Sequence, residues 1–380
     1  MNGGVRPSIP AARFAARLGQ AAEATERAGI GALLIGVGSD LRYLTGYAAL
    51  PLERCTMLVV RPGADPFLVV PRLELAAAEA GLRTPVEIRT WDETDDPYRL
   101  CIAGLAVDRV AVSDTMLAMH LLRLQDALGA ATRFELSSSV LRDMRMIKDP
   151  DEIALLRLAA EAADRVVGQI AAGRLVGRTE ADVAREVRER LVAEGHEEAH
   201  FAIVASGPAS ASPHHDASDR VIRAGEPIVL DIGGSLGGYG SDITRTLWVT
   251  GGDATRGPDE RFRDLFGVLY HAQQAAVEAV RPGATCEAVD AAARTPITDQ
   301  GYGEAFFHRT GHGIGLDGHE DPYIVVGNAL PLSEGMAFSI EPGIYLAGRY
   351  GARIEDIVVC GQDGPIVLNG APHELCVVDG

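Results

Sequence analysis

The chain has 380 residues, 47% hydrophobic and 23% charged, an ordinary globular composition with enough length for two domains that each bury a core. The net charge of −18 is uneven, because residues 148–380 hold 36 of the 53 acidic residues but only 19 of the 35 basic ones. This acidity argues against a nucleic-acid partner, since phosphate binding needs a basic face. No apolar run resembles a membrane span or a signal peptide, so a cytoplasmic protein without a membrane partner is expected.

The five cysteines are scattered, odd in number and form no C-x-x-C pair. This pattern argues against a disulfide framework and against a structural zinc knuckle. We therefore expect isolated buried thiols.

Residues 1–147 alternate between helix and strand patterns. A helix is predicted over residues 10–27, ended by Gly29, and the apolar run 32–37 follows as a buried strand. Further strand-like runs occupy residues 56–60, 67–70, 86–88 and 110–112. The alternation predicts an α/β domain. Its Gly36-Val37-Gly38 lacks the third glycine of a dinucleotide-binding loop and is interpreted as a plain turn, so no residue is assigned to an organic cofactor.

The domain boundary is predicted between residues 147 and 148. Asp149 can cap a helix, Pro150 suits its first turn, and Glu152 can close a capping box. Apolar residues then recur at three- and four-residue steps up to residue 170, which indicates a helix with one apolar face. Further helices are predicted over 179–194, over 258–280 and from 285, where Pro296 should kink or end the last one.

Two β-hairpins are predicted among these helices, the first from residues 227–232 and 242–249 and the second from residues 336–345 and 352–360. Each carries two acids, one per strand: Asp231 with Asp242, and Glu341 with Glu355. The shared arrangement indicates an internal duplication of a helix-plus-hairpin half. The predicted fold is thus an α/β domain over 1–147, followed over 148–380 by an α+β domain with two pseudo-twofold halves.

The hairpin acids point to metal binding. An acid in a strand rich in Ile, Val and Leu is costly unless it is paired or bound to a metal, and two buried ionised acids repel each other. Divalent cations resolve that conflict, and four carboxylates balance two of them. The glycine-rich run at 310–320, TGHGIGLDGHE, adds His312 and His319. Oxygen-dominated ligation with one imidazole suits manganese or cobalt better than a thiolate-type zinc site. The sequence therefore predicts a two-metal hydrolase.

Five stretches of the second domain resemble those of proline-specific metallopeptidases with the pita-bread fold, namely Xaa-Pro dipeptidases (prolidases) and aminopeptidase P. In chain order they read SGPASASPHH, VLDIGGSLGGYGSDITRT, HRTGHGIGLDGHEDPYI, MAFSIEPGIY and GARIEDIVV, and SDLRYLTGY extends the resemblance more weakly into the first domain. The resemblance implies two divalent metal ions per subunit, manganese with cobalt or zinc as alternatives. The implied ligands are Asp231, Asp242, His312, Glu341 and Glu355.

The same resemblance implies roles in catalysis. Glu341 would act as the general base, while His214 and His319 would position the substrate and stabilise the tetrahedral intermediate. A dinuclear-metal-bridged hydroxide would attack the Xaa-Pro bond of a small peptide with proline in second position. A homodimer is also implied, because in related proteins the first domain can reach the site of a neighbouring subunit.

One departure from the family pattern concerns the free carboxylate of a dipeptide. Many prolidases place an arginine a few residues after the HE pair, where this chain has Tyr323. Either the substrate is longer, as for aminopeptidase P, or another cation binds the carboxylate, and Arg42 is our hypothesis for it. Arg353 could orient a carboxylate or pair on the surface, and His215 is interpreted as a surface neighbour rather than a ligand.

An Xaa-Pro dipeptidase is the leading hypothesis from the sequence. The alternatives are aminopeptidase P activity on longer peptides and a non-peptidase hydrolase or lyase on the same scaffold, as the creatinases illustrate. The complete set of five ligand positions argues against a metal-free enzyme of the creatinase type and against a binding protein that has lost catalysis. A methionine aminopeptidase is less favoured, because those enzymes usually lack a large α/β N-terminal domain.

Overall fold

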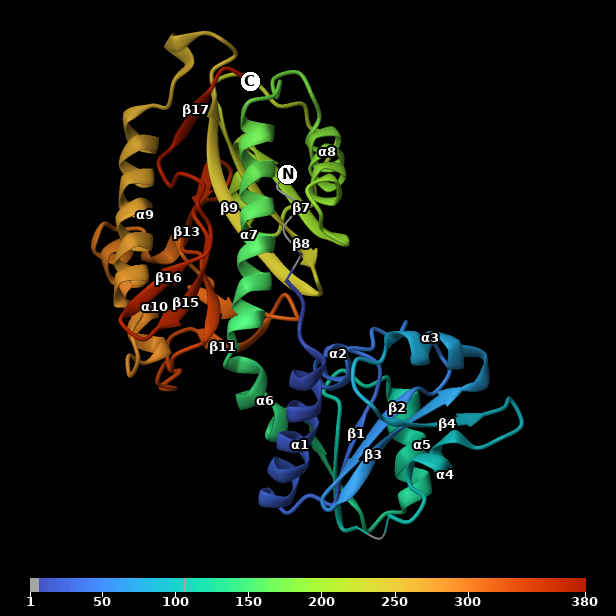
Figure 1. Cartoon of the computed structure of the whole chain (residues 1–380). Helices are drawn as coiled ribbons and strands as arrows, with labels where there is room; N and C mark the ends of the chain where they lie inside the picture. Colours follow the sequence, from blue (N-terminus) through green and yellow to red (C-terminus); the bar gives the residue numbers. More distant parts are fainter. Residues whose placement is uncertain (1–6, 106) are drawn as a thin grey trace. The chain divides into compact units, whose positions relative to one another are not determined.

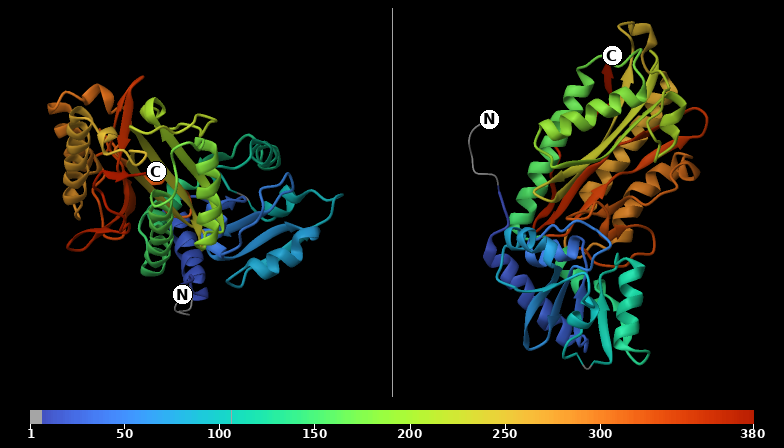
Figure 2. Two further views of the ribbon diagram at one scale, coloured as in Figure 1. Left: turned by 90° about the horizontal axis from the view of Figure 1, so that it is seen from above. Right: turned by 90° about the vertical axis from the view of Figure 1, so that its right-hand side faces the viewer.

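A computed structural model describes residues 7–105 and 107–380 (Figures 1 and 2). The chain divides into two compact units, one formed by Ser8–Arg145 and the other, among the described residues, by Pro7 and Met146–Gly380. Within the described ranges no helix is long and apolar enough to cross a bilayer.

The first unit contains one mixed six-stranded sheet in the order β4-β3-β2-β1-β5-β6. Strand β1 is buried along its whole length, as expected for an apolar strand covered on both faces. The five predicted strands all occur near their expected positions, and β6 is an addition. The strands are β1 (Ala32–Ile35), β2 (Met57–Arg61), β3 (Ala64–Pro71), β4 (Glu87–Trp91), β5 (Arg109–Val112) and β6 (Arg133–Leu136), and the helices are α1 (Ala11–Arg27), α2 (Ser39–Thr45), α3 (Leu75–Gly81), α4 (Pro97–Cys101), α5 (Ala118–Leu128) and α6 (Ser138–Met146).

The second unit combines a four-stranded sheet (β17-β9-β8-β7), a five-stranded sheet (β11-β10-β12-β15-β16) and the pair β13-β14. Its helices are α7 (Pro150–Ala171), α8 (Glu180–Ala193), α9 (Glu260–Ala279) and α10 (Cys286–Asp299). Its strands are β7 (Glu198–Ser206), β8 (Glu226–Leu236), β9 (Tyr239–Val249), β10 (Gly311–Gly313), β11 (Glu320–Ile324), β12 (Ala337–Ile340), β13 (Gly343–Leu346), β14 (Tyr350–Arg353), β15 (Asp356–Gly361), β16 (Gly364–Val367) and β17 (Cys376–Val378).

The two larger hydrophobic clusters of the second unit divide it into halves. One core packs α7 and α8 against β7, β8 and β9, and the other packs α9 and α10 against the strands that follow them. In Figure 1 the green and orange helix pairs lie on opposite sides of the strands, and Figure 2 shows the same order from above. Helix α7 begins at the predicted capping box, in which Asp149 accepts a hydrogen bond from the Glu152 N–H and Glu152 accepts one from the Asp149 N–H. Each half is therefore a helix pair with a β-ribbon.

The second predicted hairpin is not one continuous ribbon. Strand β12 pairs with β15 and β13 pairs with β14, so the chain bends at Glu341-Pro342 and again before Asp356. Pro342 has no N–H with which to continue the ladder. Glu355 leaves its own ribbon, because its N–H donates to the carbonyl oxygen of Thr244 in β9 at 3.1 Å. Both acids of this ribbon thus lie at breaks between strands.

Pro296 was expected to kink or end the last helix, and it does not end it, because α10 continues to Asp299. Proline removes only its own N–H bond, and its carbonyl still accepts from the N–H of Gln300 at 3.3 Å. The buried Ala293 and Ile297 on either side of it hold the helix against the core.

The cysteines agree with the sequence expectation except at one position. All five thiols are free, and four of them are buried. Cys376 is exposed, because it lies on β17 at the edge of the four-stranded sheet.

Candidate metal centre

The β8–β9 hairpin places Asp231 and Asp242 on one face. Asp231 pairs with Thr244 and Gly233 pairs with Asp242, so the two acids are diagonal neighbours in the antiparallel ladder. Their exposed fractions are only 7% and 5%. Two acids in such close register are costly without a cation between them.

Glu355 and Glu341 reach the same region from the other half of the unit. The Thr244 hydroxyl donates to Oε2 of Glu355 at 2.6 Å, so this threonine orients a carboxylate in addition to extending the strand. Oε1 of Glu341 accepts from the Ser339 hydroxyl at 3.0 Å. The breaks in the second ribbon therefore turn both acids toward the first hairpin.

Strand β10 fits between its neighbours only because of its glycines. A Cβ at Gly311 would lie 1.8 Å from the carbonyl oxygen of Ser339, and one at Gly313 would lie 2.2 Å from that of Asp321. Side chains at these positions would push β10 away from β12 and β11. Glycine on both sides of His312 is thus a requirement of the packing.

His312 completes the cluster with a neutral ring. Its Nε2 lies 3.3 Å from Oε1 of Glu341 and 3.6 Å from Oδ2 of Asp242. Its Nδ1 donates to the carbonyl oxygen of Gly313 at 3.1 Å, which leaves Nε2 free to act as a ligand. Burial lowers the pKa of His312 to about 3. Ligand atoms of Asp242, His312 and Glu355 all lie within 4.8 Å of one another.

Among the described residues, protein charges balance the acids of the cluster only in part. Burial and the neighbouring acids raise the pKa of Asp242 and of Glu355 well above the usual range, and burial raises the pKa of Glu341 to about 7. The buried guanidinium of Arg353 pairs with Asp231 and is the one arginine that an ion pair joins to these acids among residues 7–105 and 107–380. The other oxygen of Asp231 is buried without a hydrogen-bond partner. This oxygen-rich set with one imidazole fits divalent cations.

The acids line a cavity of about 510 Å³. Imidazoles and arginines form part of its wall, and apolar side chains form another part. Its lining residues are Phe201, Ile203, Pro213, His214, Asp231, Asp242, His308, Arg309, His312, His319, Glu341, Arg353 and Glu355.

His319 lies directly beside the ligand set, with its ring centroid 3.8 Å from that of His312. Nη2 of Arg309 lies 3.1 Å from Nδ1 of His319. Because arginine can only donate, Nδ1 accepts and the proton of the neutral ring is on Nε2. Burial and the charge of Arg309 lower the pKa of His319, which keeps the ring neutral.

His214 reaches the cavity from the segment that follows β7. Its neighbour His215, interpreted as a surface neighbour rather than a ligand, is only 20% exposed, so the surface part of that interpretation is corrected. Nε2 of His215 lies 2.7 Å from Oε2 of Glu180, which is fully buried and also accepts hydrogen bonds from the hydroxyls of Ser206 and Ser218. Glu180 begins α8 directly beneath the segment, a contact that the sequence pattern does not reveal.

The remaining candidates have different surroundings. Arg353 is only 2% exposed, so it orients a carboxylate and is not a surface pair. The ring of Tyr323 lies 4.5 Å from the guanidinium carbon of Arg309 but does not line the cavity. Arg42 belongs to the first unit, where it is half-buried on α2.

The sequence reasoning missed the apolar residues Phe201 and Ile203 of the wall and also two of its polar residues, although both polar residues belong to the stretch HRTGHG. His308 lies 3.0 Å from the Tyr345 hydroxyl through its Nε2, and burial lowers the pKa of its ring to about 4. Arg309 is the second arginine of the wall. Their nearness to His312 in sequence was the available signal.

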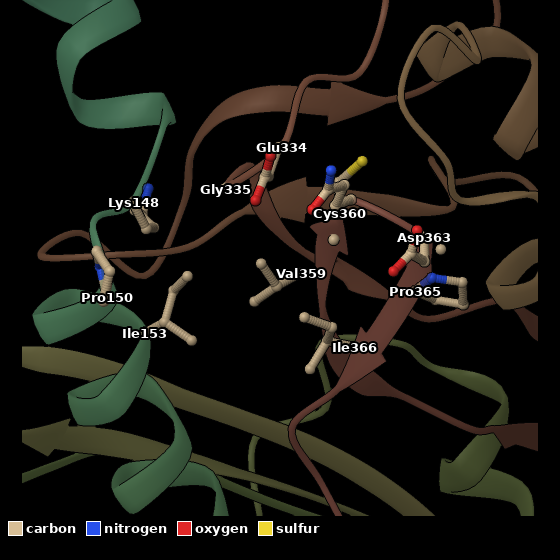
Figure 3. A pocket seen from close by; sticks show the side chains of 13 residues that line it. Lys148, Pro150, Ile153, Glu334, Gly335, Val359, Cys360, Asp363, Pro365 and Ile366 are labelled. Carbon is tan, nitrogen blue, oxygen red and sulfur yellow. The ribbon is translucent and has the colours of Figure 1, made fainter.

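A larger hollow of about 660 Å³ lies elsewhere in the second unit, between the start of α7 and the β15–β16 hairpin (Figure 3). The side chains of Ile153, Val359 and Ile366 face this space. None of the candidate ligands lines it. The candidate metal ligands therefore line the smaller cavity.

The chain belongs to metallopeptidase family M24, which residues 154–362 match, and residues 17–147 match the Creatinase/Prolidase N-terminal domain. The protein is thus a metallopeptidase. It is 50% identical over 374 residues to the probable dipeptidase PepE of Mycobacterium tuberculosis, with 96% of each chain covered. It is 34% identical over 354 residues to the Xaa-Pro dipeptidase of Pyrococcus horikoshii, with 93% of this chain and 96% of that one covered.

A solved structure with a similar fold is that of a dipeptidase as well. The crystal structure of dipeptidase PepE from Mycobacterium ulcerans superposes with a TM-score of 0.89 at 48% sequence identity, covering 98% of this chain and 99% of that one. The predicted resemblance to the pita-bread metallopeptidases and the predicted fold class are therefore confirmed.

Proposed function

We propose that the protein is an Xaa-Pro dipeptidase that works with two divalent cations, manganese foremost. The observation that carries the proposal is the buried cluster of four acids and one imidazole, in which Arg353 pairs with Asp231 while the pKa values of Asp242 and Glu355 stay raised. The relatives named as dipeptidases and as an Xaa-Pro dipeptidase support the substrate class.

The proposal gives each group of the cluster a role. Asp231, Asp242, His312, Glu341 and Glu355 would hold the cations, which when bound polarise the scissile carbonyl and lower the pKa of the attacking water. The Glu341 side chain remains 16% exposed, so it can take the proton of a water molecule in the cavity. Ser339 fixes the carboxylate in place for that transfer through its 3.0 Å hydrogen bond.

The cavity histidines would act on the substrate oxygen. His319 carries its proton on Nε2, so it can donate to the oxygen on which negative charge develops. His214 faces the same cavity from the opposite half of the unit. Both rings are available as donors while His312 is committed to the cations.

The apolar part of the wall suits a proline-containing substrate. An Xaa-Pro imide lacks the N–H by which peptidases commonly hold a peptide bond, so recognition must depend on shape and on apolar contact. Phe201, Ile203 and Pro213 supply such contact next to the acids.

The test is hydrolysis by chelated protein that is reconstituted with one metal at a time. We expect manganese or cobalt to restore cleavage of Ala-Pro, with Ala-Ala cleaved far more slowly. Failure of manganese, cobalt and zinc alike to restore cleavage would contradict the proposal. Size-exclusion chromatography tests the predicted homodimer.

Tyr323, in place of an arginine after the HE pair, favours aminopeptidase P activity as a second candidate. Ala-Pro-Ala separates the two candidates, since only the second predicts that the tripeptide is cleaved faster than Ala-Pro.

A further inference from the structure

We propose that Arg309 binds the free carboxylate at the C-terminus of the substrate and thereby restricts the enzyme to dipeptides, an inference that rests on the proposed function. Nothing in the ligand set requires an arginine at this position. Arg309 nevertheless lines the proposed reaction cavity, and its guanidinium gives the wall a positive charge.

Within the part of the chain that the structure describes, the charge of Arg309 has no acidic partner. Across residues 7–105 and 107–380, no carboxylate oxygen lies within 4.0 Å of its guanidinium. The other arginine of the wall, Arg353, is occupied by Asp231, Thr244 and Tyr345. Arg309 is therefore the guanidinium of the cavity wall that remains available to an anion from solution.

The guanidinium is held in place without being neutralised. It lies over the ring of Tyr323 at 4.5 Å, a cation–π contact, and one N–H points to Nδ1 of His319 at 3.1 Å. These contacts leave further N–H groups of the planar fork free to bind a carboxylate, and little side-chain entropy is lost on binding. Tyr323 thus packs against the guanidinium of Arg309. The resemblance to prolidases would instead place an arginine at the position of Tyr323.

The distance from the ligand set suits a dipeptide. Arg309 contacts His319, whose ring centroid is 3.8 Å from that of His312, so one imidazole connects the guanidinium to a proposed ligand. In a dipeptide the carboxylate belongs to the residue directly after the scissile bond, and consecutive Cα atoms are about 3.8 Å apart. A tripeptide would place an uncharged amide there and lose the charge-assisted hydrogen bond.

The experiment is a double-mutant cycle in which one change is made in the enzyme, at Arg309, and the other in the substrate, at its C-terminal carboxylate. The manganese-loaded wild type, Arg309→Ala and Arg309→Lys are each assayed for kcat/KM on Ala-Pro and on its C-terminal amide. We expect Arg309→Ala to lose roughly 10- to 100-fold on Ala-Pro, mainly through KM, and far less on the amide. Arg309→Lys should keep part of the preference for the acid, since it retains the charge without the fork.

Two further variants make the result specific. Arg349→Ala is the matched control, because Arg349 lies over Tyr350 at 5.5 Å but is exposed and outside the cavity, so it should leave the preference unchanged. Arg42→Ala tests the other candidate cation. Thermal unfolding of each variant confirms that the fold persists.

The outcomes separate the explanations. The proposal is overturned if Arg309→Ala keeps the wild-type preference for the acid, if it loses equally on acid and amide as a group that only orients His319 would, or if Arg42→Ala alone removes the preference. A wild type that hydrolyses neither peptide overturns the proposed function, and with it this proposal. If the wild type cleaves Ala-Pro but Arg309→Ala does not lose more kcat/KM on the acid than on the amide, only the role of Arg309 is overturned.

Discussion

Glu355 and Asp356 are adjacent in sequence, equally buried and opposite in electrostatic environment. The carboxylate of Asp356 accepts hydrogen bonds from Arg245 at 2.7 Å and Gln273 at 2.7 Å, and lies 2.6 Å from Nε2 of His373. Burial alone would raise the pKa of Asp356, but Arg245 and His373 outweigh it and hold the pKa below its usual value. For Glu355, burial and the charge of Asp242 both raise the pKa.

The difference teaches how to recognise a binding site among buried acids. An acid that finds a complete set of protein donors belongs to the fold, because its charge is satisfied as soon as the chain folds. An acid whose nearest charges are other acids is satisfied only by something that arrives from solution. Charge balance separates Glu355 from Asp356, whereas burial does not.

The largest effect should come from Glu355→Gln. The substitution removes a proposed ligand, so we expect kcat/KM with saturating manganese to fall by about 10³-fold or more. It also removes repulsion from Asp242, so the metal-free protein should become no less stable. Activity assays and thermal unfolding in chelator check the two halves. A marked loss of stability with activity retained would show that Glu355, like Asp356, has a structural role and is not a metal ligand.

The opposite result is expected one residue further on. Asp356→Asn breaks a buried ion pair and leaves Arg245 without its counter-charge, which should lower the free energy of unfolding by about 3–5 kcal/mol. Denaturant unfolding measures this loss, with the exposed Asp363→Asn as the control expected to change little. A change in Asp356→Asn no larger than in the control would show that the buried pair contributes nothing.

The pH dependence of stability sharpens the same contrast. In metal-free protein the pKa of Glu341 is raised from 4.5 to about 7, so between these values the folded state binds more protons than the unfolded state. The contribution of Glu341 to the free energy of unfolding is fully present below pH 4.5. It falls by on the order of 3 kcal/mol as the pH rises through 7. Unfolding of the wild type and of Glu341→Gln in chelator across this range measures the difference.

Manganese should abolish that loss in the wild type, because the cation favours the ionised acid. A wild type and a Glu341→Gln variant with the same pH dependence in chelator would contradict the raised pKa.

Much of the centre could be predicted because its signals are local. Asp231 and Asp242 stand in one hairpin whose glycine bend and apolar strands are visible in the sequence, and the ladder then places them on one face. His312 lies between glycines that its packing requires. Charged residues in apolar strands were sufficient signals because burying them has an evident cost.

The parts that escaped prediction depend on contacts between distant segments. The break before Glu355 follows from its bond to Thr244, which is 111 positions away. Arg309 stands out because no acid of the described residues lies within 4.0 Å of its guanidinium, and no sequence pattern reports what a side chain lacks. His215 was taken for a surface residue because Glu180, its partner, comes 35 positions earlier.

Glu180 provides the smallest predicted effect and a third case for the comparison. Like Asp356 it is satisfied by protein donors, because the hydrogen bonds from His215 and Ser206 outweigh burial and lower its pKa. Its donors nevertheless belong to the segment that carries His214 into the cavity, so a satisfied acid can also serve the site. We expect His215→Ala to lower kcat/KM by about 10-fold as His214 loses its support.

His215→Gln should recover part of the rate, since an amide N–H can still donate to Glu180. The exposed His200→Ala is the matched control, with no expected loss. The decisive comparison is kinetic, because a purely structural pair would lower the unfolding temperature of His215→Ala and leave kcat per folded molecule unchanged. That result would show that Glu180 stabilises the fold and does not support catalysis. Buried acids with complete sets of protein donors would then contribute to stability only.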